Sequence, residues 1–268
     1  MFSLCLNLLY TWKRISIQMK MQESLYSIFN TSAEDHWWFV GRREIILRLV
    51  GEIIGNQPYH RILDIGSGVG ATLKQLEELG VAFGVDISAE AIDYCRDRGC
   101  RRLCLVDEER LPFGDNMFDL IISMDILEHM DHEYRHLREY RRVLKNGGRL
   151  IITVPALSWL WSNHDRANRH RRRYSRTDLK DLLVKEGWQI ERLSYFCTLL
   201  FPLVMVIRLI SKMVTRVAGD YDPSWNFQIP GFGLNNLFRR IFSREACWLT
   251  KRDFPIGSSL LAICRKSE

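Results

Sequence analysis

The sequence lacks the features that mark disulfide-bonded, zinc-binding, repetitive and membrane-spanning proteins. Its seven cysteines are scattered and odd in number, and no Cys-x-x-Cys pair occurs, so we interpret them as reduced thiols in the core of a cytosolic protein. No internal repeat or low-complexity tract is present. The apolar run at residues 2–10 is too short to cross a bilayer. Lys13 and Arg14 follow this run, whereas the charges of a signal peptide precede its apolar part.

Length and composition favour one elaborated α/β domain. The 268 residues can bury a full core, and 47% hydrophobic with 26% charged residues is ordinary for a globular protein. We divide the chain into a dispensable N-terminal extension (residues 1–18), a helical lid (19–60), a main domain (61–197 with 257–266) and an inserted helical segment (198–256). Met19 or Met21 is the expected working start.

A glycine-rich turn within residues 61–70 organises the rest of the chain. The sequence Arg-Ile-Leu-Asp-Ile-Gly-Ser-Gly-Val-Gly predicts a short buried strand, a turn and the start of a helix. Glycines let a ligand approach the backbone, and the following helix offers free N–H groups to a nucleotide-like ligand. Gly66, Gly68 and Ala71 fit the G-x-G-x-x-G/A pattern of dinucleotide binders, so the glycines alone leave a nicotinamide cofactor possible.

The residues that follow alternate between amphipathic helices and apolar strands, as in a doubly wound α/β sheet. Helices are predicted at 71–79, 132–145 and 177–186, and strands at 81–85, 102–106, 120–124, 149–154 and 188–194. Gly80 and the Asn146-Gly147-Gly148 run should end the helices before them. The last strand is expected at 258–264, antiparallel to the strand at 188–194.

Four further motifs decide which kind of cofactor the glycine turn binds. They are Asp107 followed by Leu-Pro-Phe, then Asp-Asn-Met-Phe-Asp, then Leu-Glu-His, then Leu-Lys-Asn-Gly-Gly-Arg-Leu-Ile-Ile-Thr-Val-Pro. Together with Asp64, two residues ahead of Gly66, they resemble the class I S-adenosylmethionine (SAM) methyltransferases, in the type 11 family that includes the quinone-ring methylases. The resemblance covers roughly residues 34–195. It implies SAM as cofactor and a Rossmann-like, seven-stranded, mostly parallel sheet with an antiparallel last strand and helices on both faces.

The resemblance also implies which residues meet the cofactor. Asp86, about 20 residues after the first glycine, would hold the ribose hydroxyls. The other contacts would be Asp64, Gly66, Ser67, Gly68 and Gly70 at the amino-acid end, Ile87 beside the adenine, Asp107 and Glu108 at the adenine edge, and Met124 and Asp125 facing the sulfonium.

The run His-Trp-Trp-Phe-Val-Gly-Arg-Arg at residues 36–43 resembles the segment that precedes the glycine turn in many bacterial relatives. As a lid over the cofactor, it would place Arg42 or Arg43 against a carboxylate, with Arg42 at the cofactor and Trp38 at the substrate. Ordinary core packing explains the same aromatic cluster equally well.

Methyl transfer from a sulfonium depends on alignment and water exclusion, because the leaving group is already good. A base is required only when the acceptor carries a proton of high pKa. The candidate bases are His170, His129, His164 and Asp165, although each could be a structural residue. Asp125, Glu128 and His129 also have the acid-x-x-Glu-His spacing that binds a divalent metal in a few relatives, such as the small-RNA ribose methylases. That ligand set is incomplete without a distant histidine, so we predict no metal.

Residues 159–174 should leave the sheet beside the cofactor, at the carboxyl end of the fifth strand. Between residues 166 and 176 there are six arginines, one histidine and no acid, which accounts for much of the formal charge of +6. We expect an acceptor site with an aromatic wall of Trp161 and Tyr174, and a clamp of Arg171 and Arg172 for a phosphate or carboxylate. A solvated basic loop is the alternative.

The inserted segment predicts two amphipathic helices with basic flanks. Residues 195–207 are almost all apolar, and the basic residues Arg208, Lys212 and Arg216 follow at the helical spacing of four. The second helix has an apolar side, with Arg239, Arg240 and Arg244 elsewhere on it. We expect this segment to dock on an anionic membrane surface; cover for the sheet and a dimer contact are the alternatives.

Three functions follow from these patterns. The preferred one is SAM-dependent methyl transfer to a small-molecule, lipid or lipid-linked acceptor, by a cytoplasmic enzyme that associates with the inner face of the membrane. The second is a nucleic-acid methylase that uses the basic loop at 166–176. The third is a SAM-fold binding module without catalysis.

Overall fold

The computed structural model describes residues 26–55, 60–107, 110–218 and 228–267, and the side chains of these residues except 214–218. The expected N-terminal extension, both candidate start methionines and Glu108 lie outside this part of the chain.

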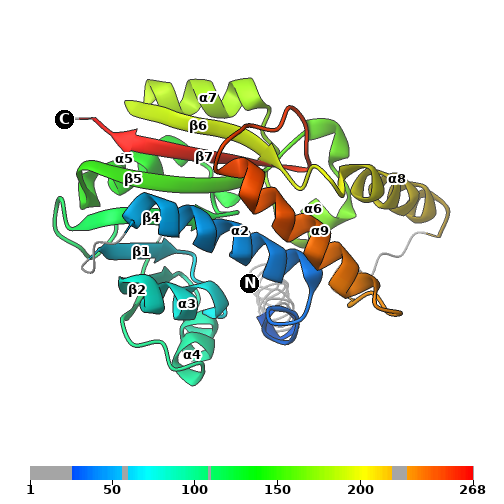
Figure 1. The fold of residues 1–268 in the computed structure, drawn as a ribbon, viewed down its shortest axis with the longest axis horizontal. Coiled ribbons are helices and arrows are strands. Elements are labelled where there is room, and N and C mark those ends of the chain that lie inside the picture. The colour runs from blue at the N-terminus through cyan, green and yellow to red at the C-terminus, as the bar shows by residue number, and fades with distance from the viewer. Residues whose placement is uncertain (1–25, 56–59, 108–109, 219–227, 268) are drawn as a thin grey trace, which may run out of the picture.

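A seven-stranded sheet forms the centre of the molecule (Figure 1). Its strand order is β3-β2-β1-β4-β5-β7-β6, and β7 alone among these strands runs antiparallel to the other six. The strands are β1 (Arg61–Ile65), β2 (Val81–Asp86), β3 (Leu103–Leu105), β4 (Phe118–Met124), β5 (Leu144–Pro155), β6 (Trp188–Phe196) and β7 (Ser259–Lys266). The predicted Rossmann-like fold class and the antiparallel pairing of the last strand with β6 are confirmed.

The central strands are apolar on both faces because helices cover both faces of the sheet. Ile62 and Leu63 of β1, Ile121 of β4 and Ile151 of β5 are fully buried. The helices are α2 (Trp37–Ile54), α3 (Ala71–Leu79), α4 (Ala89–Asp97), α5 (Glu133–Val143), α6 (Asn163–Ala167), α7 (Arg176–Lys185), α8 (Phe201–Ala218) and α9 (Leu234–Leu249), with 3₁₀ turns at Leu127–His129 (η1) and Ser158–Leu160 (η2). In Figure 1, α2 and α9 cross in front of the sheet and α5 lies behind β5.

One predicted boundary is wrong. The helix expected at 132–145 ends at Val143, and the strand expected at 149–154 already begins at Leu144. Leu144 pairs with Phe118, and the register then shifts, so that Arg149 pairs with Leu120. Gly147, which has a φ of 77°, allows this irregular strand to pass through the Asn-Gly-Gly run that looked like a helix stop.

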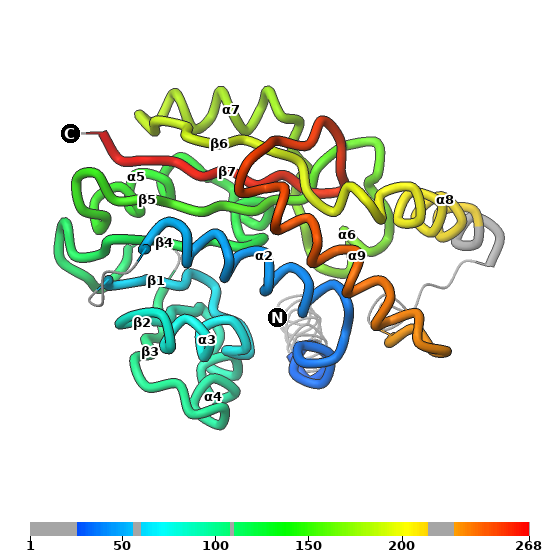
Figure 2. Tube along the Cα trace, viewed as in Figure 1, coloured from blue at the N-terminus to red at the C-terminus, as the bar shows by residue number. Residues whose placement is uncertain are grey.

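The inserted segment supplies α8 and α9, and the two helices differ in how they meet the rest of the molecule. Helix α9 packs against α2, where Phe242 stacks on Trp38 with ring centroids 5.1 Å apart and Arg239 pairs with Glu44. Helix α8 extends away from the sheet at one end of the molecule (Figure 2). Among the described helices, none combines the length and apolar character needed to cross a membrane.

Candidate functional site

The glycine turn joins β1 to α3 and has the backbone geometry that only glycine adopts easily. Gly66 has a φ of 71°, and a Cβ atom built there would lie 2.1 Å from Cδ1 of Ile126. Gly70, with a φ of 78°, is the N-cap of α3. The turn therefore cannot take side chains at these positions without strain.

Asp86 closes this turn from the end of β2. It is buried, and its carboxylate accepts backbone N–H groups from Gly68 at 2.9 Å and from Ser88 at 3.0 Å. Tyr26, from the helical residues 26–32, also hydrogen-bonds this carboxylate. Burial raises the pKa of Asp86, and these hydrogen bonds oppose the shift. Ile87, the next residue, is exposed, as expected for a side chain beside a bound ring.

Asp64 is a second buried carboxylate at the turn, and it differs from Asp86 in its partners. Neither carboxylate oxygen of Asp64 has a hydrogen-bond partner among the residues that the structure describes. Burial, and next the charge of Asp86, raise the pKa of Asp64 to about 7. A cationic group of a ligand would stabilise the ionised form of Asp64 here.

Arg42 and Asp125, both predicted to contact the cofactor, form an ion pair with each other. Asp125 follows Met124 at the end of β4, has a φ of 54°, and accepts a hydrogen bond from Thr153 at 3.0 Å. Arg42 thereby ties α2 to the end of the strand. Asp107 is exposed just beyond β3 and accepts the backbone N–H of Arg110 at 3.2 Å.

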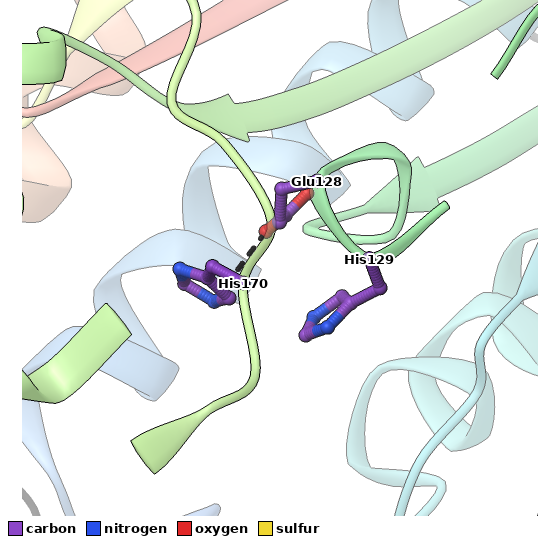
Figure 3. Close-up of side chains that lie close together, drawn as sticks. All are labelled: Glu128, His129 and His170. Carbon is purple, nitrogen blue, oxygen red and sulfur yellow. Dashed lines mark ion pairs between the residues drawn. The ribbon is translucent and has the colours of Figure 1, made fainter. Parts of the chain in front are cut away.

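A cluster of ionisable side chains lies next to this edge of the sheet (Figure 3). Glu128 and His129 come from η1, and His170 comes from the loop before α7. Nε2 of His170 is 3.8 Å from Oε1 of Glu128, and the rings of His129 and His170 meet edge to face with centroids 5.0 Å apart. The fold thus brings together two of the three histidines that the sequence offered as bases.

Burial dominates the electrostatics of this cluster. It raises the pKa of Glu128 well above its ordinary value, with a further contribution from Asp125. It lowers the pKa of His129 to about 4, with a further contribution from His170. Burial, and next the charge of Arg208, also lower the pKa of His164, whose ring lies 6.2 Å from that of His170. The uncharged forms of these three groups are therefore favoured.

Asp165 fixes His170 in place. Its Oδ1 lies 2.9 Å from Nδ1 of His170 and 2.8 Å from Nε of Arg173, and its Oδ2 accepts the backbone N–H of Ser162 at 2.8 Å. Burial raises the pKa of Asp165, but the hydrogen bond from His170 and the charge of Arg173 outweigh it, so the pKa is well below its usual range. An ionised Asp165 accepts a hydrogen bond from Nδ1–H of His170, and in that tautomer Nε2 of His170 carries the free electron pair.

The side chains predicted to bind the acceptor are engaged within the protein. Arg171 pairs with Asp131, and Arg172 pairs with Glu133. Tyr174 is buried, and its hydroxyl donates to the carbonyl of Leu127 at 3.3 Å. Trp161 is partly exposed, and Trp38 stacks on Phe242 and Phe196, which also stack on each other. The observed contacts of Trp38 agree with the core-packing interpretation. Contacts of an acceptor with Trp38, Trp161, Arg171, Arg172 or Tyr174 stay predictions.

Sequence reasoning missed the partners that hold the site together. Arg173, Thr153 and Tyr26 contact Asp165, Asp125 and Asp86 respectively, and no motif marks them. The sequence did place Arg173 in the basic loop. It could not show that this side chain is only 8% exposed.

Comparison with known proteins identifies the domain. Residues 63–152 match the family described as "Methyltransferase domain". A ubiquinone/menaquinone biosynthesis C-methyltransferase from Cupriavidus necator is 36% identical over 114 residues, which are 39% of this chain and 47% of that protein. A probable tRNA methyltransferase 9B from Bos taurus is 36% identical over 117 residues, which are 42% of this chain and 24% of that protein.

Solved structures extend the likeness in fold beyond the matched residues. The [4+2]-cyclase SpnF aligns over 93% of this chain and 94% of its own, with a TM-score of 0.60 and 20% identity. The chain spans about half the length of the first curated relatives or less. It contains a class I SAM-dependent methyltransferase domain, so the sequence-based recognition of the domain and of its cofactor is confirmed.

Proposed function

We propose that this protein transfers a methyl group from SAM, bound at the glycine turn, to an acceptor bound beside Glu128 and His170. One observation carries the proposal: Asp64, Asp86 and Asp125 lie at or next to the carboxyl ends of the adjacent strands β1, β2 and β4, beside the glycine turn. All of these residues fall within the methyltransferase match at residues 63–152. In open α/β sheets, ligands bind at this carboxyl edge of the strands.

The residues present fit the cofactor. A Cβ atom at Gly68 would meet only the carbonyl oxygen of Gly66, at 4.0 Å, so the turn has open space on this side, and Asp64 has two buried oxygens that a cationic amino group would satisfy. Asp86 would accept the ribose hydroxyls, with Ile87 and Asp107 toward the adenine, and Glu108 lies outside the described residues. When bound, SAM supplies a methyl group activated by its sulfonium. Arg42 and Asp125 would close the site over Met124 by tying α2 to β4.

On the acceptor side, we assign the catalytic role to His170 and His129, with Asp165 as the positioning residue for His170. The electron pair on Nε2 of His170 points toward Glu128 and can accept a proton or bind a cation. The ring of His164 lies 6.2 Å from that of His170, and the backbone carbonyl of His164 accepts a hydrogen bond from the Asn168 side chain at 2.9 Å. We therefore assign His164 a structural role in the loop and not the role of a base.

A small-molecule, lipid or lipid-linked acceptor fits this site better than a nucleic acid. Nucleic-acid binding needs arginines that face outward together. In the basic loop, Arg173 is buried against Asp165, and Arg171 and Arg172 pair with acids on different residues. The quinone-biosynthesis relative is named as a C-methyltransferase, which agrees with a small-molecule acceptor. The tRNA methyltransferase relative agrees with a nucleic-acid acceptor. Because the two relatives differ, we base the proposed acceptor class on the contacts of the basic loop.

We also propose that α8 and the start of α9 meet an anionic lipid surface. Exposed apolar side chains gather here: Val206, Ile207, Leu209, Ile210 and Met213 on α8, and Phe232, Leu234 and Leu237 at the start of α9. The sequence of α8 contains no acid, and Arg240 and Arg244 of α9 are exposed. An apolar surface with basic flanks is the arrangement that suits a headgroup interface.

Calorimetry and a transfer assay test the enzymatic proposal. The full chain should bind SAM, and labelled SAM should transfer its methyl group to one class among fractionated lipid, small-molecule, RNA and protein extracts. Tight NAD binding without SAM binding would overturn the proposal. SAM binding with no labelled acceptor in any fraction would favour the binding module without catalysis.

Vesicle co-sedimentation tests the lipid proposal. The protein should sediment with anionic vesicles at low salt, and Ile207→Glu with Ile210→Glu should reduce this binding while SAM affinity stays unchanged. Val184→Glu, which places the same charge at an exposed apolar position on α7, is the matched control. Equal sedimentation of both variants and the wild type would contradict the assignment to α8.

A further inference from the structure

Glu128 is a buried carboxylate without a hydrogen-bond donor among the described residues. The side chain is fully buried, and neither of its carboxylate oxygens has a hydrogen-bond partner within the described residues. A buried carboxylate without donors costs free energy, and in native proteins such groups are commonly paired or bind metals. What Glu128 lacks is a positive charge close to its oxygens.

Two imidazole rings lie near this carboxylate, that of His129 from the same turn and that of His170 from a separate loop (Figure 3). Nε2 of His170 is 3.8 Å from Oε1 of Glu128, which is too long for a hydrogen bond. One ligand atom from each of Glu128, His129 and His170 lies within 4.8 Å of the other two. Ligand atoms around one transition-metal ion are bonded at about 2.0–2.2 Å, so small side-chain rotations would bring these three onto a common ion.

The surroundings of His170 match those of a metal-binding histidine. Such a histidine almost always donates its second ring N–H to a carboxylate or carbonyl group. Asp165 accepts from Nδ1 of His170 at 2.9 Å, and Arg173 holds Asp165 from its other side at 2.8 Å. This arrangement fixes the tautomer and directs the electron pair of Nε2 toward Glu128.

We propose that Glu128, His129 and His170 bind a divalent transition-metal cation. Two imidazoles and one carboxylate are a donor set that suits first-row transition metals and leaves coordination positions open. The sequence pattern contained two of these ligands and lacked a distant histidine, which the fold supplies from the loop before α7. Asp125, which the spacing had suggested as a ligand, is instead paired with Arg42 and Thr153.

The position of this site gives the cation a role, which rests on the proposed methyl transfer. Ile126, two residues before Glu128, packs against Gly66 of the glycine turn, where a Cβ atom would lie 2.1 Å from its Cδ1 atom. The cation would therefore lie on the acceptor side and polarise an oxygen atom of the acceptor as a Lewis acid. His170 is then a ligand, and a chelator should stop transfer without displacing SAM.

Titration with Co²⁺ tests the site directly. The full chain, first stripped with a chelator, should bind one Co²⁺ per chain, with visible ligand-field bands that Zn²⁺ abolishes by displacement. Intense near-ultraviolet bands, which signal thiolate ligands, should be absent. Their presence would assign the metal to cysteines such as the exposed Cys247 and would overturn the proposal.

Variants locate the bound ion. Glu128→Gln and His170→Ala should each weaken Co²⁺ binding by more than about tenfold, since each removes a ligand atom. The controls are His132→Ala, an exposed histidine on the same loop, and Glu245→Gln, a fully buried glutamate that accepts backbone N–H groups beside α8. Both controls should bind Co²⁺ as the wild type does.

Binding of SAM separates the possible failures. Each variant is first shown to bind SAM with wild-type affinity, and if Glu128→Gln does not fold, His170→Ala decides. Absence of Co²⁺ binding by the wild type, or equal binding by wild type and His170→Ala, would overturn the metal site. If SAM still binds in that case, the proposed methyl transfer stands and His170 is returned to the role of a base.

Discussion

Asp86 on the cofactor side and Asp165 on the acceptor side are held in different ways. On the cofactor side, Asp86 accepts main-chain N–H groups from Gly68 and Ser88, which lie close to it in the β1 and β2 loops. On the acceptor side, Asp165 is held by the side chains of His170 and Arg173, and Glu128 is held by nothing in the described chain. Asp86 thus relies on main-chain donors, and Asp165 relies on two side chains as well as the N–H of Ser162, so the two should respond differently to substitution.

The largest effect is expected from Asp165→Ala. This change would leave Arg173 buried without its carboxylate partner, and removing one partner of a buried ion pair costs about 3–5 kcal/mol. Asp131→Ala, which removes the exposed partner of Arg171, should cost no more than about 1 kcal/mol. Urea unfolding followed by circular dichroism measures both. Equal losses for the two variants would show that burial does not distinguish these pairs.

Acid should reveal the same ion pair in the wild type. The folded-state pKa of Asp165 lies below its unfolded value of about 3.9, so its stabilising contribution is complete above that pH. The contribution is lost as the pH falls through the folded-state value. Asp165→Ala should therefore unfold with a weaker acid dependence than the wild type.

Asp86→Ala should have the next largest effect, and on SAM binding more than on stability. Loss of the hydrogen bonds to the ribose hydroxyls should weaken SAM binding by about 1.5–3 kcal/mol, or roughly 10- to 150-fold. Asp93→Ala removes an exposed carboxylate on the neighbouring α4 and should leave the affinity unchanged. Isothermal titration calorimetry compares them. Wild-type affinity in Asp86→Ala would remove Asp86 from the cofactor site.

The same difference explains what the sequence could predict. Asp64, Gly66 and Asp86 lie at fixed offsets from one strand and one turn, so the local pattern placed them at one edge of the sheet, and the resemblance implied a mostly parallel sheet with an antiparallel last strand. The pairing of His170 with Glu128 joins positions 42 residues apart, and it exists only because the loop before α7 folds back onto η1. The Arg42–Asp125 pair was missed for the same reason: each residue was assigned to the cofactor, and neither pattern indicated the other.

The pH dependence of SAM binding sharpens the comparison on the cofactor side. Burial raises the pKa of Asp64 to about 7, so the free protein carries a largely neutral Asp64 below that pH. If Asp64 meets the cationic amino group of SAM, affinity should rise with pH between about 5.5 and 7, by up to about tenfold per unit. Calorimetry across this range should show a flat profile for Asp64→Asn. A flat wild-type profile would separate Asp64 from the amino group.

The smallest effect on stability is expected from Arg171→Ala with Arg172→Ala, and this pair decides what the basic loop does. The side chains of Arg171 and Asp131 are 51% and 62% exposed, and such pairs contribute about 0–1 kcal/mol. Since stability depends little on the exposed pair, Arg171 is free to exchange Asp131 for an anionic acceptor, whereas Arg172 would have to leave Glu133, whose side chain is 13% exposed.

If both arginines do so, the double variant should keep its SAM affinity and raise the KM for the acceptor that the transfer screen identifies. Arg96→Ala, which breaks an exposed pair with Asp93 on α4, is the control for a lost surface charge. If the loop binds nucleic acid instead, the wild type should retain RNA with a steep dependence on salt, and the double variant should lose that dependence. An unchanged KM together with no RNA binding would leave the loop as a solvated basic surface, because neither anionic ligand then needs the two charges.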